Sequence, residues 1–255
     1  MILRRLGNKQ AIAEKIIKYF PKHNCYVEPF FGAGGMFFNK KKANYNILND
    51  LDSDVFNLFQ VVINDKEQLK SNFEIMPIHA DLLDYWKKNK ETEPIKKALR
   101  FLFLSNLTYL GKGGTLSYLT SDAEYNILDK LEKTQKKLFG CRFNNSDFRK
   151  VFSSLSFRGR EKDALNTFIY CDPPYLGTDD NYSDSFTEKD SIDLFNCLIT
   201  SGCKFAMSEF DNEFIINQAK ERGLNVIIIG ERKNLKNRRT EILITNYKNN
   251  QLTIF

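Results

Sequence analysis

The segment Asp172-Pro173-Pro174-Tyr175 is the part of this sequence that points most directly to chemistry. It follows the apolar run 168–171, which has the composition of a buried strand. The Asp172 carboxylate and the Pro173 carbonyl can each accept one hydrogen from an exocyclic NH2 group, and the Tyr175 ring offers a stacking face. The segment therefore predicts a pocket for a planar amine whose lone pair is directed at an electrophile. A proline turn with an exposed tyrosine is the alternative.

A glycine-rich segment, Glu28-Pro29-Phe30-Phe31-Gly32-Ala33-Gly34, leads from a predicted strand toward a predicted helix. Glycines let backbone amides approach a ligand closely at the carboxyl end of a strand. The G-x-G-x-x-G spacing of a nicotinamide site is missing, and such glycines also serve tight helix–strand packing. Asp50, at the end of the next predicted strand, favours a cofactor loop because it can accept both hydroxyl hydrogens of a ribose. A turn or helix-capping Asp is the alternative.

Apolar periodicity predicts the elements that position these segments. A helix over 9–20 ends before Pro21, a helix opens at 32–35, and Asp52 or Ser53 caps a helix through Val62. Strands are predicted at 24–27, 45–49, 142–144, 167–171, 204–207, 224–229 and 241–247. Later helices are predicted near 187–199 and 211–221, the second ended by Gly223. Alternating strands and helices indicate parallel strands, whereas the last two strands, with no helix between them, indicate an antiparallel edge.

The alternation breaks between about residues 66 and 140, where the pattern predicts helices and a glycine-tipped hairpin within 109–125. With 255 residues and 42% hydrophobic content, the chain is long enough for one large domain carrying such an insertion. No apolar run approaches the roughly 20 residues that span a bilayer, so we expect a cytoplasmic protein without a membrane partner. Five cysteines without a CxxC pair and two histidines give no zinc spacing, so free thiols and no metal are expected.

In this order, with the cofactor-type loop first and Asp-Pro-Pro-Tyr last, the sequence resembles the Dam-type adenine-specific DNA methyltransferases of the alpha arrangement. The resemblance covers most of the chain. Residues 4–9 resemble the family's N-terminal motif, residues 28–34 its F-x-G-x-G motif, and residues 146–148 the motif that lines the cofactor's adenine. Residues 238–243 resemble its closing R-x-x-E-L-L-type strand. The resemblance implies Asp172, Pro173, Pro174 and Tyr175 as catalytic residues and S-adenosylmethionine contacts from Asn8, Lys9, Glu28, Phe30, Phe31, Gly32, Ala33, Gly34, Asp50, Asp147, Phe148 and Asp172.

The family resemblance also implies an α/β fold with a Rossmann-like, seven-stranded, mostly parallel sheet. Residues 1–65 and 141–255 would form the catalytic domain, and 66–140 a helical target-recognition insertion with a hairpin. In the insertion, residues 101–116 resemble the family's passage that approaches DNA, with Asn106, Tyr109 and Lys112 as candidate contacts. A solvated hairpin tip is the alternative for Lys112. No arginine lies between Arg100 and Arg142, so the resemblance does not extend to a GATC target, whose guanine is usually read by arginine.

The activity implied is transfer of a methyl group from S-adenosylmethionine to the N-6 amine of an adenine flipped out of duplex DNA. RNA or protein-amide methylation, N-4 methylation of cytosine, and a non-catalytic DNA-binding subunit of a restriction-modification system remain alternatives. A restriction endonuclease acting on the same site is a candidate partner, whereas the recognised bases and the oligomeric state are not determined. The net charge of +6 does not decide the partner. Most basic clusters are expected to be solvated and some to touch phosphates: 40–42, 87–88, 96–97, 136–137, 158–160 and 232–239.

Overall fold

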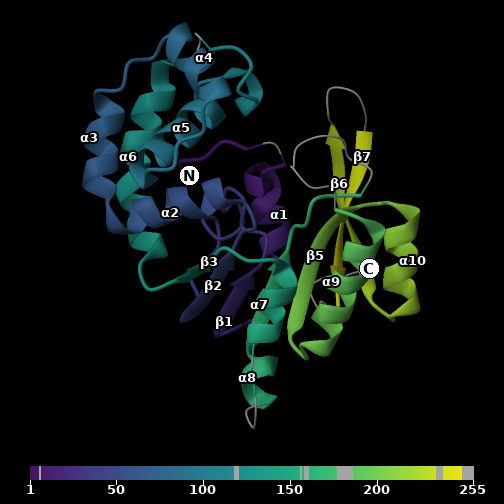
Figure 1. The fold of residues 1–255 in the computed structure, drawn as a ribbon. Coiled ribbons are helices and arrows are strands. Elements are labelled where there is room, and N and C mark those ends of the chain that lie inside the picture. The colour runs from purple at the N-terminus through teal and green to yellow at the C-terminus, as the bar shows by residue number, and fades with distance from the viewer. Residues whose placement is uncertain are drawn as a thin grey trace. The chain divides into compact units, whose positions relative to one another are not determined.

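The computed structural model describes residues 1–5, 7–117, 121–155, 157, 161–176, 186–233 and 238–248 (Figure 1). The chain divides into two compact units. Unit 1 comprises Met1–Ala11, Gly32–Lys40 and Asp50–Asn145, and unit 2 comprises Ile12–Phe31, Lys41–Asn49 and Ser146–Phe255. The limits expected for a catalytic domain and an insertion at 66–140 stay a prediction.

The strands form one seven-stranded sheet in the order β3-β2-β1-β4-β5-β7-β6. β1 pairs in parallel with β2 and β4, and β4 with β5, whereas β7 is antiparallel to β5 and β6. The predicted α/β fold with a mostly parallel seven-stranded sheet is therefore confirmed. The antiparallel strand lies one place inside the edge, because β7 inserts between β5 and β6. The strands are β1 Cys25–Glu28, β2 Tyr45–Asn49, β3 Arg142–Asn144, β4 Thr167–Cys171, β5 Lys204–Phe210, β6 Asn225–Lys233 and β7 Arg238–Thr245.

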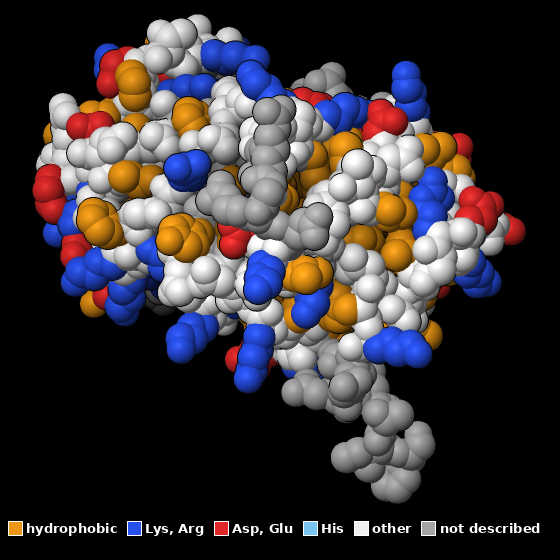
Figure 2. All heavy atoms as spheres, turned by 90° about the horizontal axis from the view of Figure 1, so that it is seen from below, with side chains coloured by type: hydrophobic (Ala, Val, Ile, Leu, Met, Phe, Trp, Pro, Cys, Tyr) orange, Lys and Arg blue, Asp and Glu red, His pale blue; other side chains and the backbone are white. Residues whose placement is uncertain are grey.

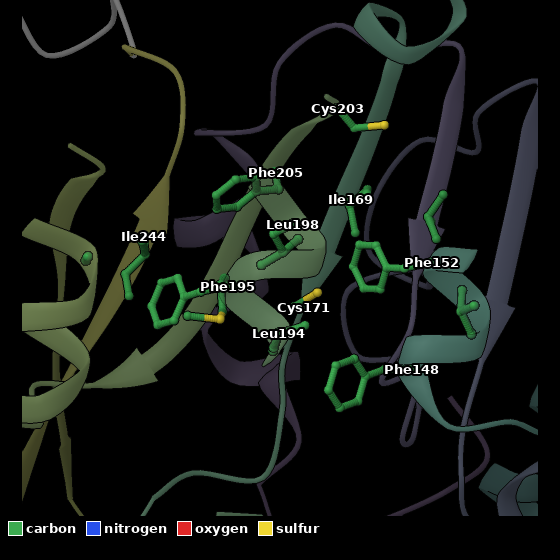
Figure 3. Close-up of a cluster of buried hydrophobic side chains, with 14 of the residues drawn as sticks. Phe148, Phe152, Ile169, Cys171, Leu194, Phe195, Leu198, Cys203, Phe205 and Ile244 are labelled. Atoms are coloured by element: carbon green, nitrogen blue, oxygen red, sulfur yellow. The ribbon is translucent and has the colours of Figure 1, made fainter. Parts of the chain in front are cut away.

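In unit 2, α7 and α9 pack together and contribute to a hydrophobic core with the central strands (Figure 3). All five residues of β4 are buried, as expected for a strand covered on both faces. Leu194, Phe195 and Leu198 of α9 share this core with Ile169 of β4 and Phe205 of β5. The helices of unit 2 are α1 Ala13–Ile17, α7 Phe148–Ser154, α8 Glu161–Leu165, α9 Glu188–Thr200 and α10 Glu213–Glu221.

Two helix predictions near the glycine loop were wrong or too long. The predicted helix over 9–20 is a short 3-10 segment, η1 Lys9–Ile12, followed by α1, which ends at Ile17. The helix predicted to open at 32–35 is a series of turns, because Gly32 and Gly34 have φ angles of +53° and +73°. These left-handed conformations cannot start a right-handed helix. Gly223, with φ +66°, does follow α10 as predicted.

Unit 1 is mostly helical, as predicted for the middle of the chain, and also contains β3. Asp52 caps its first helix, since its carboxylate accepts the Asp54 N–H at 2.9 Å. In the described part of the predicted hairpin, Thr108 and Leu116 form an antiparallel bridge around η2 Tyr109–Gly111, and the Ser117 N–H donates to the Leu107 carbonyl at 2.9 Å. Residues 118–120 of the predicted hairpin lie outside the described residues. No helix among the described residues is both long and apolar enough to cross a bilayer. The helices are α2 Ser53–Asn64, α3 Lys66–Glu74, α4 Ala80–Lys88, α5 Pro94–Asn106 and α6 Ser121–Leu138.

Candidate active site

The Asp172 to Tyr175 segment begins where β4 ends, at the carboxyl edge of the sheet. β1 is the parallel neighbour of β4, so the loop that begins at Pro29 leaves the sheet at the same edge. The chain continues from β1 to β2 on one side and from β4 to β5 on the other, so the strand order reverses between β1 and β4. Ligands of open α/β sheets bind at such switch points. Asp172 and Tyr175 are partly exposed there, and Pro173 is buried.

The Tyr175 side chain is held at both its hydroxyl and its ring. The hydroxyl donates to Glu241 Oε1 at 2.6 Å, and Glu241 is 1% exposed on β7. The ring packs against Phe210 with centroids 4.5 Å apart and an interplanar angle of 78°. Burial, with the nearby charges of Asp172 and Glu241, raises the pKa of Tyr175 well above its usual value. Tyr175 is therefore a neutral hydrogen-bond donor at physiological pH.

A layer of buried polar groups lies on the strands next to this segment. The Tyr170 and Ser208 hydroxyls are 2.8 Å apart, and the Tyr26 hydroxyl donates to Glu28 Oε2 at 2.8 Å. Burial raises the pKa of both phenols well above normal, and neighbouring carboxylates add to the effect. Glu28, assigned by resemblance to the cofactor, is 2% exposed. Its carboxylate thus belongs at least in part to the hydrogen bonding of β1.

Asn49, the last residue of β2, connects two of the predicted motifs within unit 2. Its side-chain amide donates to the Pro29 and Ser146 carbonyls, both at 2.9 Å. Its Oδ1 accepts the Ser146 N–H at 3.1 Å, and its own carbonyl accepts the Phe31 N–H at 2.9 Å. Asn49 therefore fixes the start of the glycine loop beside the Ser146 to Phe148 motif. Asn49 was not among the site residues predicted from the sequence, although its position directly before Asp50 could have pointed to it.

Asp50 organises the glycine loop within unit 1. Its Oδ2 accepts the Gly32 N–H at 2.6 Å and its Oδ1 accepts the Asp52 N–H at 2.9 Å. Burial raises the pKa of Asp50, while the charge of Arg5 and the two N–H groups oppose that shift. Arg5 also pairs with Asp52 at 2.8 Å. Each carboxylate oxygen retains lone-pair capacity for a further donor, so Asp50 fits the hydroxyls of a ribose.

The loop backbone also fits a closely bound cofactor. A Cβ placed on Gly32 would meet no atom within 4 Å, so its α-carbon faces open space. Gly35 is different, since a Cβ there would lie 2.3 Å from Asn8 Oδ1. The Asn8 oxygen accepts the Gln10 N–H at 2.9 Å, so the N-terminal motif packs directly on the loop. Lys9, Phe31 and Ala33 are buried, with 3%, 2% and 4% of their surfaces exposed.

The Asp147 and Phe148 motif begins α7 on unit 2. Asp147 caps the helix by accepting the Arg149 N–H at 2.8 Å. Phe148 lies 5.5 Å from Phe30 between ring centroids, and Phe186 is 6.0 Å from both rings. The Arg149 guanidinium stacks 4.4 Å from the Phe148 ring and pairs with carboxylates of α9. Phe30 and Phe148, predicted separately, are thus brought together in an aromatic cluster suited to a flat ring.

The three candidate DNA contacts have different environments within unit 1. Asn106 is 5% exposed, and its amide donates to the Ile2 and Leu102 carbonyls at 3.1 Å, so it holds the N-terminal segment against α5. Tyr109 is 62% exposed, and Lys112 is also exposed. Between them Leu110 has a φ of +55° and is 43% exposed. Sequence spacing could not separate the buried amide from the exposed loop residues.

The predicted basic clusters are only partly available to a polyanion. Lys40 is 4% exposed, and the Lys137 ammonium donates to the Phe38 and Lys40 carbonyls at 3.0 and 2.8 Å. Lys97 pairs with Asp54 at 3.3 Å. Residues 158–160 and 234–237 of the clusters lie outside the described residues. On the face drawn in Figure 2, Lys and Arg side chains are spread among hydrophobic and acidic ones rather than gathered in one patch.

Comparisons of the sequence with a family model and with curated proteins point to one family. The model of the D12 class N6 adenine-specific DNA methyltransferases matches residues 6–235. A DNA adenine methylase of Haemophilus influenzae is 33% identical over 199 residues, covering 68% of this chain and 63% of that protein. The DNA adenine methylase of Escherichia coli K12 is 27% identical over 194 residues, covering 68% and 64%. The chain's match therefore spans less than two thirds of the length of these two relatives.

A solved structure, the rRNA methyltransferase AviRa of Streptomyces viridochromogenes, superimposes with a TM-score of 0.40 at 10% identity. The superposition covers 92% of this chain and 83% of the AviRa chain. A likeness of this size supports no inference about function.

Proposed function

The chain belongs to the D12 class N6 adenine-specific DNA methyltransferase family, and from that premise we propose that it transfers a methyl group from S-adenosylmethionine to the N-6 amine of adenine in duplex DNA. The observation that carries the proposal is the place of Asp172 to Tyr175 after β4, at the switch point of the sheet. The segment combines two acceptors for an amine with a stacking ring on a rigid proline turn.

In this proposal the chain's main task is to align a weak nucleophile. The adenine amine is poorly nucleophilic because its lone pair is delocalised into the ring. Asp172 and the Pro173 carbonyl accept its two hydrogens, so the lone pair is directed away from them, and Tyr175 stacks on the base. As positive charge develops on the nitrogen, the same acceptors stabilise it. Asp172 need not be a strong base, since the proton can leave to water after transfer.

S-adenosylmethionine, when bound, supplies a methyl group activated on a sulfonium. We propose that Gly32 and Gly34 allow its close approach to the loop, that Asp50 accepts its ribose hydroxyls, and that Phe30 and Phe148 contact its adenine. Asn8, the partly exposed Asp147 and Asp172 are further candidate contacts. The buried residues Lys9, Glu28, Phe31 and Ala33 would act mainly by shaping the loop, because little of their surface is open to a ligand.

Duplex DNA is the proposed substrate, and part of the loop after α5 is proposed to contact it. Tyr109 and Lys112 are exposed and can reach a duplex, whereas the buried Asn106 is not included. Removing a base from the stack costs a few kcal/mol, and stacking on Tyr175 can return about 1 to 3 kcal/mol of that cost. Phosphate contacts would have to supply the remainder. A restriction endonuclease that cuts the same site is the proposed functional partner.

Transfer of tritium from labelled S-adenosylmethionine to duplex DNA, structured RNA and protein tests the proposed substrate. We expect label in DNA alone, and nuclease digestion should place it in N6-methyladenine. Asp172→Ala is expected to abolish transfer, while calorimetry should show that the chain still binds S-adenosylmethionine, with a loss of affinity far smaller than the loss of transfer.

Label in RNA, in protein or in N4-methylcytosine would reject the proposed substrate. Failure of the wild-type chain to bind S-adenosylmethionine at all would instead favour a non-catalytic DNA-binding subunit. Sequencing of single methylated genomic DNA molecules would then give the base context.

A further inference from the structure

A buried carboxylate on β7 determines where the Tyr175 hydroxyl points. Glu241 is 66 residues away in sequence, and its Oε1 lies 2.6 Å from the Tyr175 oxygen. This distance is within the range of a hydroxyl that donates to an ionised carboxylate, which is among the stronger hydrogen bonds in proteins. Glu241 is 1% exposed, and burying a carboxylate is costly unless it is hydrogen-bonded. An apolar side chain would fill the same space at a lower cost, so core packing alone does not account for an acid here.

The plane of the Tyr175 ring is set by the neighbouring strand. Phe210 of β5 is the direct antiparallel partner of Glu241 on β7, so the two side chains project from the same face of the sheet. Both contact Tyr175, Glu241 at the hydroxyl and Phe210 at the ring, in an edge arrangement. The Arg239 guanidinium lies 5.4 Å from the centroid of the Phe210 ring and contacts it as well. A tyrosine side chain has two main torsions, and one contact at its end and another along its ring restrain both.

Pro173 and Pro174 fix two backbone φ angles before Tyr175, but they do not set the direction of its side chain. Residues 172–175 belong to no helix or strand, so no backbone ladder fixes this part of the chain. A ring that must receive a base benefits from being fixed beforehand, since ordering it during binding would reduce affinity and alignment.

We propose that Glu241 is a positioning residue that, through the Tyr175 hydroxyl, holds the ring in the orientation that receives the adenine. The proposal rests on the proposed function, because it assigns Glu241 a part in the same reaction. Glu241 itself would not touch the base, and it would act only through Tyr175.

A double-mutant cycle tests whether Glu241 acts through Tyr175. Glu241→Leu removes the acceptor, and Tyr175→Phe removes the donor while keeping the ring. Each is expected to lower kcat on a long natural duplex by about 10-fold or more, with the KM for DNA changed less than about threefold, because other contacts hold the duplex. The double variant should be no slower than the slower single variant, since both changes break one interaction. Glu241→Gln, which keeps an acceptor oxygen, should recover most of the rate.

Tyr170→Phe is the matched control for losing a buried phenol hydroxyl. Tyr170 lies on β4, five residues before Tyr175, and its hydroxyl bonds Ser208 at 2.8 Å. The control is expected to lower the melting temperature without changing kcat. A loss of kcat in Tyr170→Phe equal to that in Tyr175→Phe would show a general packing effect and overturn the proposal. Multiplied losses in the double variant, or an unchanged kcat in Glu241→Leu, would also overturn it.

A spectroscopic readout measures the hydrogen bond without measuring activity. In protein labelled with 13C at tyrosine Cζ, the resonance missing from Tyr175→Phe belongs to Tyr175. It should shift in Glu241→Leu and stay close to its wild-type position in Glu241→Gln; an unshifted resonance in Glu241→Leu would overturn the proposal. If Glu241→Leu does not fold, Tyr175→Phe decides, and an unchanged kcat in that variant rejects the positioning role. A wild-type chain that never methylates DNA would reject the proposed function itself, whereas an active wild type with a failed cycle rejects only the role of Glu241.

Discussion

Gly32→Ala adds one methyl group at the point where the glycine loop faces open space. The new Cβ would meet no protein atom within 4 Å, so it produces no clash in the folded chain. The φ of Gly32 is +53°, a conformation that costs an alanine about 1 to 2 kcal/mol. Part of that cost is offset because alanine also restricts the unfolded chain, which leaves about 1 kcal/mol. For a chain of this size we expect the melting temperature to fall by about 2 to 4 °C.

The effect of Gly32→Ala on cofactor binding is expected to be larger than its effect on stability. If S-adenosylmethionine approaches the loop backbone at Gly32, the methyl group occupies space that a ligand atom needs. Overpacking by one methyl group costs about 1 to 3 kcal/mol. That cost corresponds to an increase in Kd of about 5-fold to 150-fold. The Gly32 N–H can still donate to Asp50, since the substitution leaves the backbone amide in place.

Gly140→Ala is the matched control for backbone strain. Gly140 belongs to the same unit, has a φ of +74°, and would also place its Cβ in open space. Thermal melts of both variants should show similar losses of stability. Calorimetric titration with S-adenosylmethionine should then show weakened binding in Gly32→Ala alone. Equal Kd values for the two variants would refute the close approach of the cofactor to Gly32.

Three further predictions concern single side chains. Asp50→Asn supplies one acceptor oxygen where two backbone N–H groups need one each, so S-adenosylmethionine should bind about 10-fold or more weakly. Asp52→Asn, the control, keeps the helix cap, so its Kd for S-adenosylmethionine should stay within about twofold of the wild-type value. Equal Kd values for the two variants in calorimetry would contradict the role of Asp50. Burial would raise the pKa of Asp190, but the hydrogen bonds from the helix cap and from Arg149 outweigh it, so the pKa is lowered. The ionised Asp190 therefore stabilises the fold above the pKa it has in the unfolded chain, and this stabilisation is lost as the pH falls through its pKa in the folded chain. In Arg149→Leu the carboxylates that paired with Arg149 repel one another. The variant's deficit in melting temperature relative to wild type should therefore shrink as the pH is lowered from about 7 to about 4, and a deficit that stays constant would contradict the role of Arg149. Burial raises the pKa of Cys203 to about 11, so native-state alkylation at about pH 8 should leave it unmodified by mass spectrometry, and rapid labelling would contradict its burial.

Features that depend on neighbouring residues could be predicted from the amino-acid sequence. The strand patterns, the Asp52 cap and Gly223 after α10 were predicted because periodicity, capping and backbone freedom act over a few positions. The Asp172 to Tyr175 motif was found for the same reason, since its acceptors and ring are consecutive in the chain. The prediction of a helix opening at Gly32 was wrong because amino-acid composition does not show that Gly32 and Gly34 have positive φ angles.

The residues that support the proposed site could be identified only from the way distant segments pack together. Glu241 meets Tyr175 because β7 inserts antiparallel beside β5, a register that no local pattern specifies. Asn49 reaches Ser146 across 97 positions, and Asn106 reaches Ile2 across 104, so the amide of each is committed to a distant backbone segment. Burial and hydrogen bonding are properties of the packed chain. The amino-acid types therefore indicated the chemistry, whereas packing determines which side chains stabilise the structure and which remain accessible to a ligand.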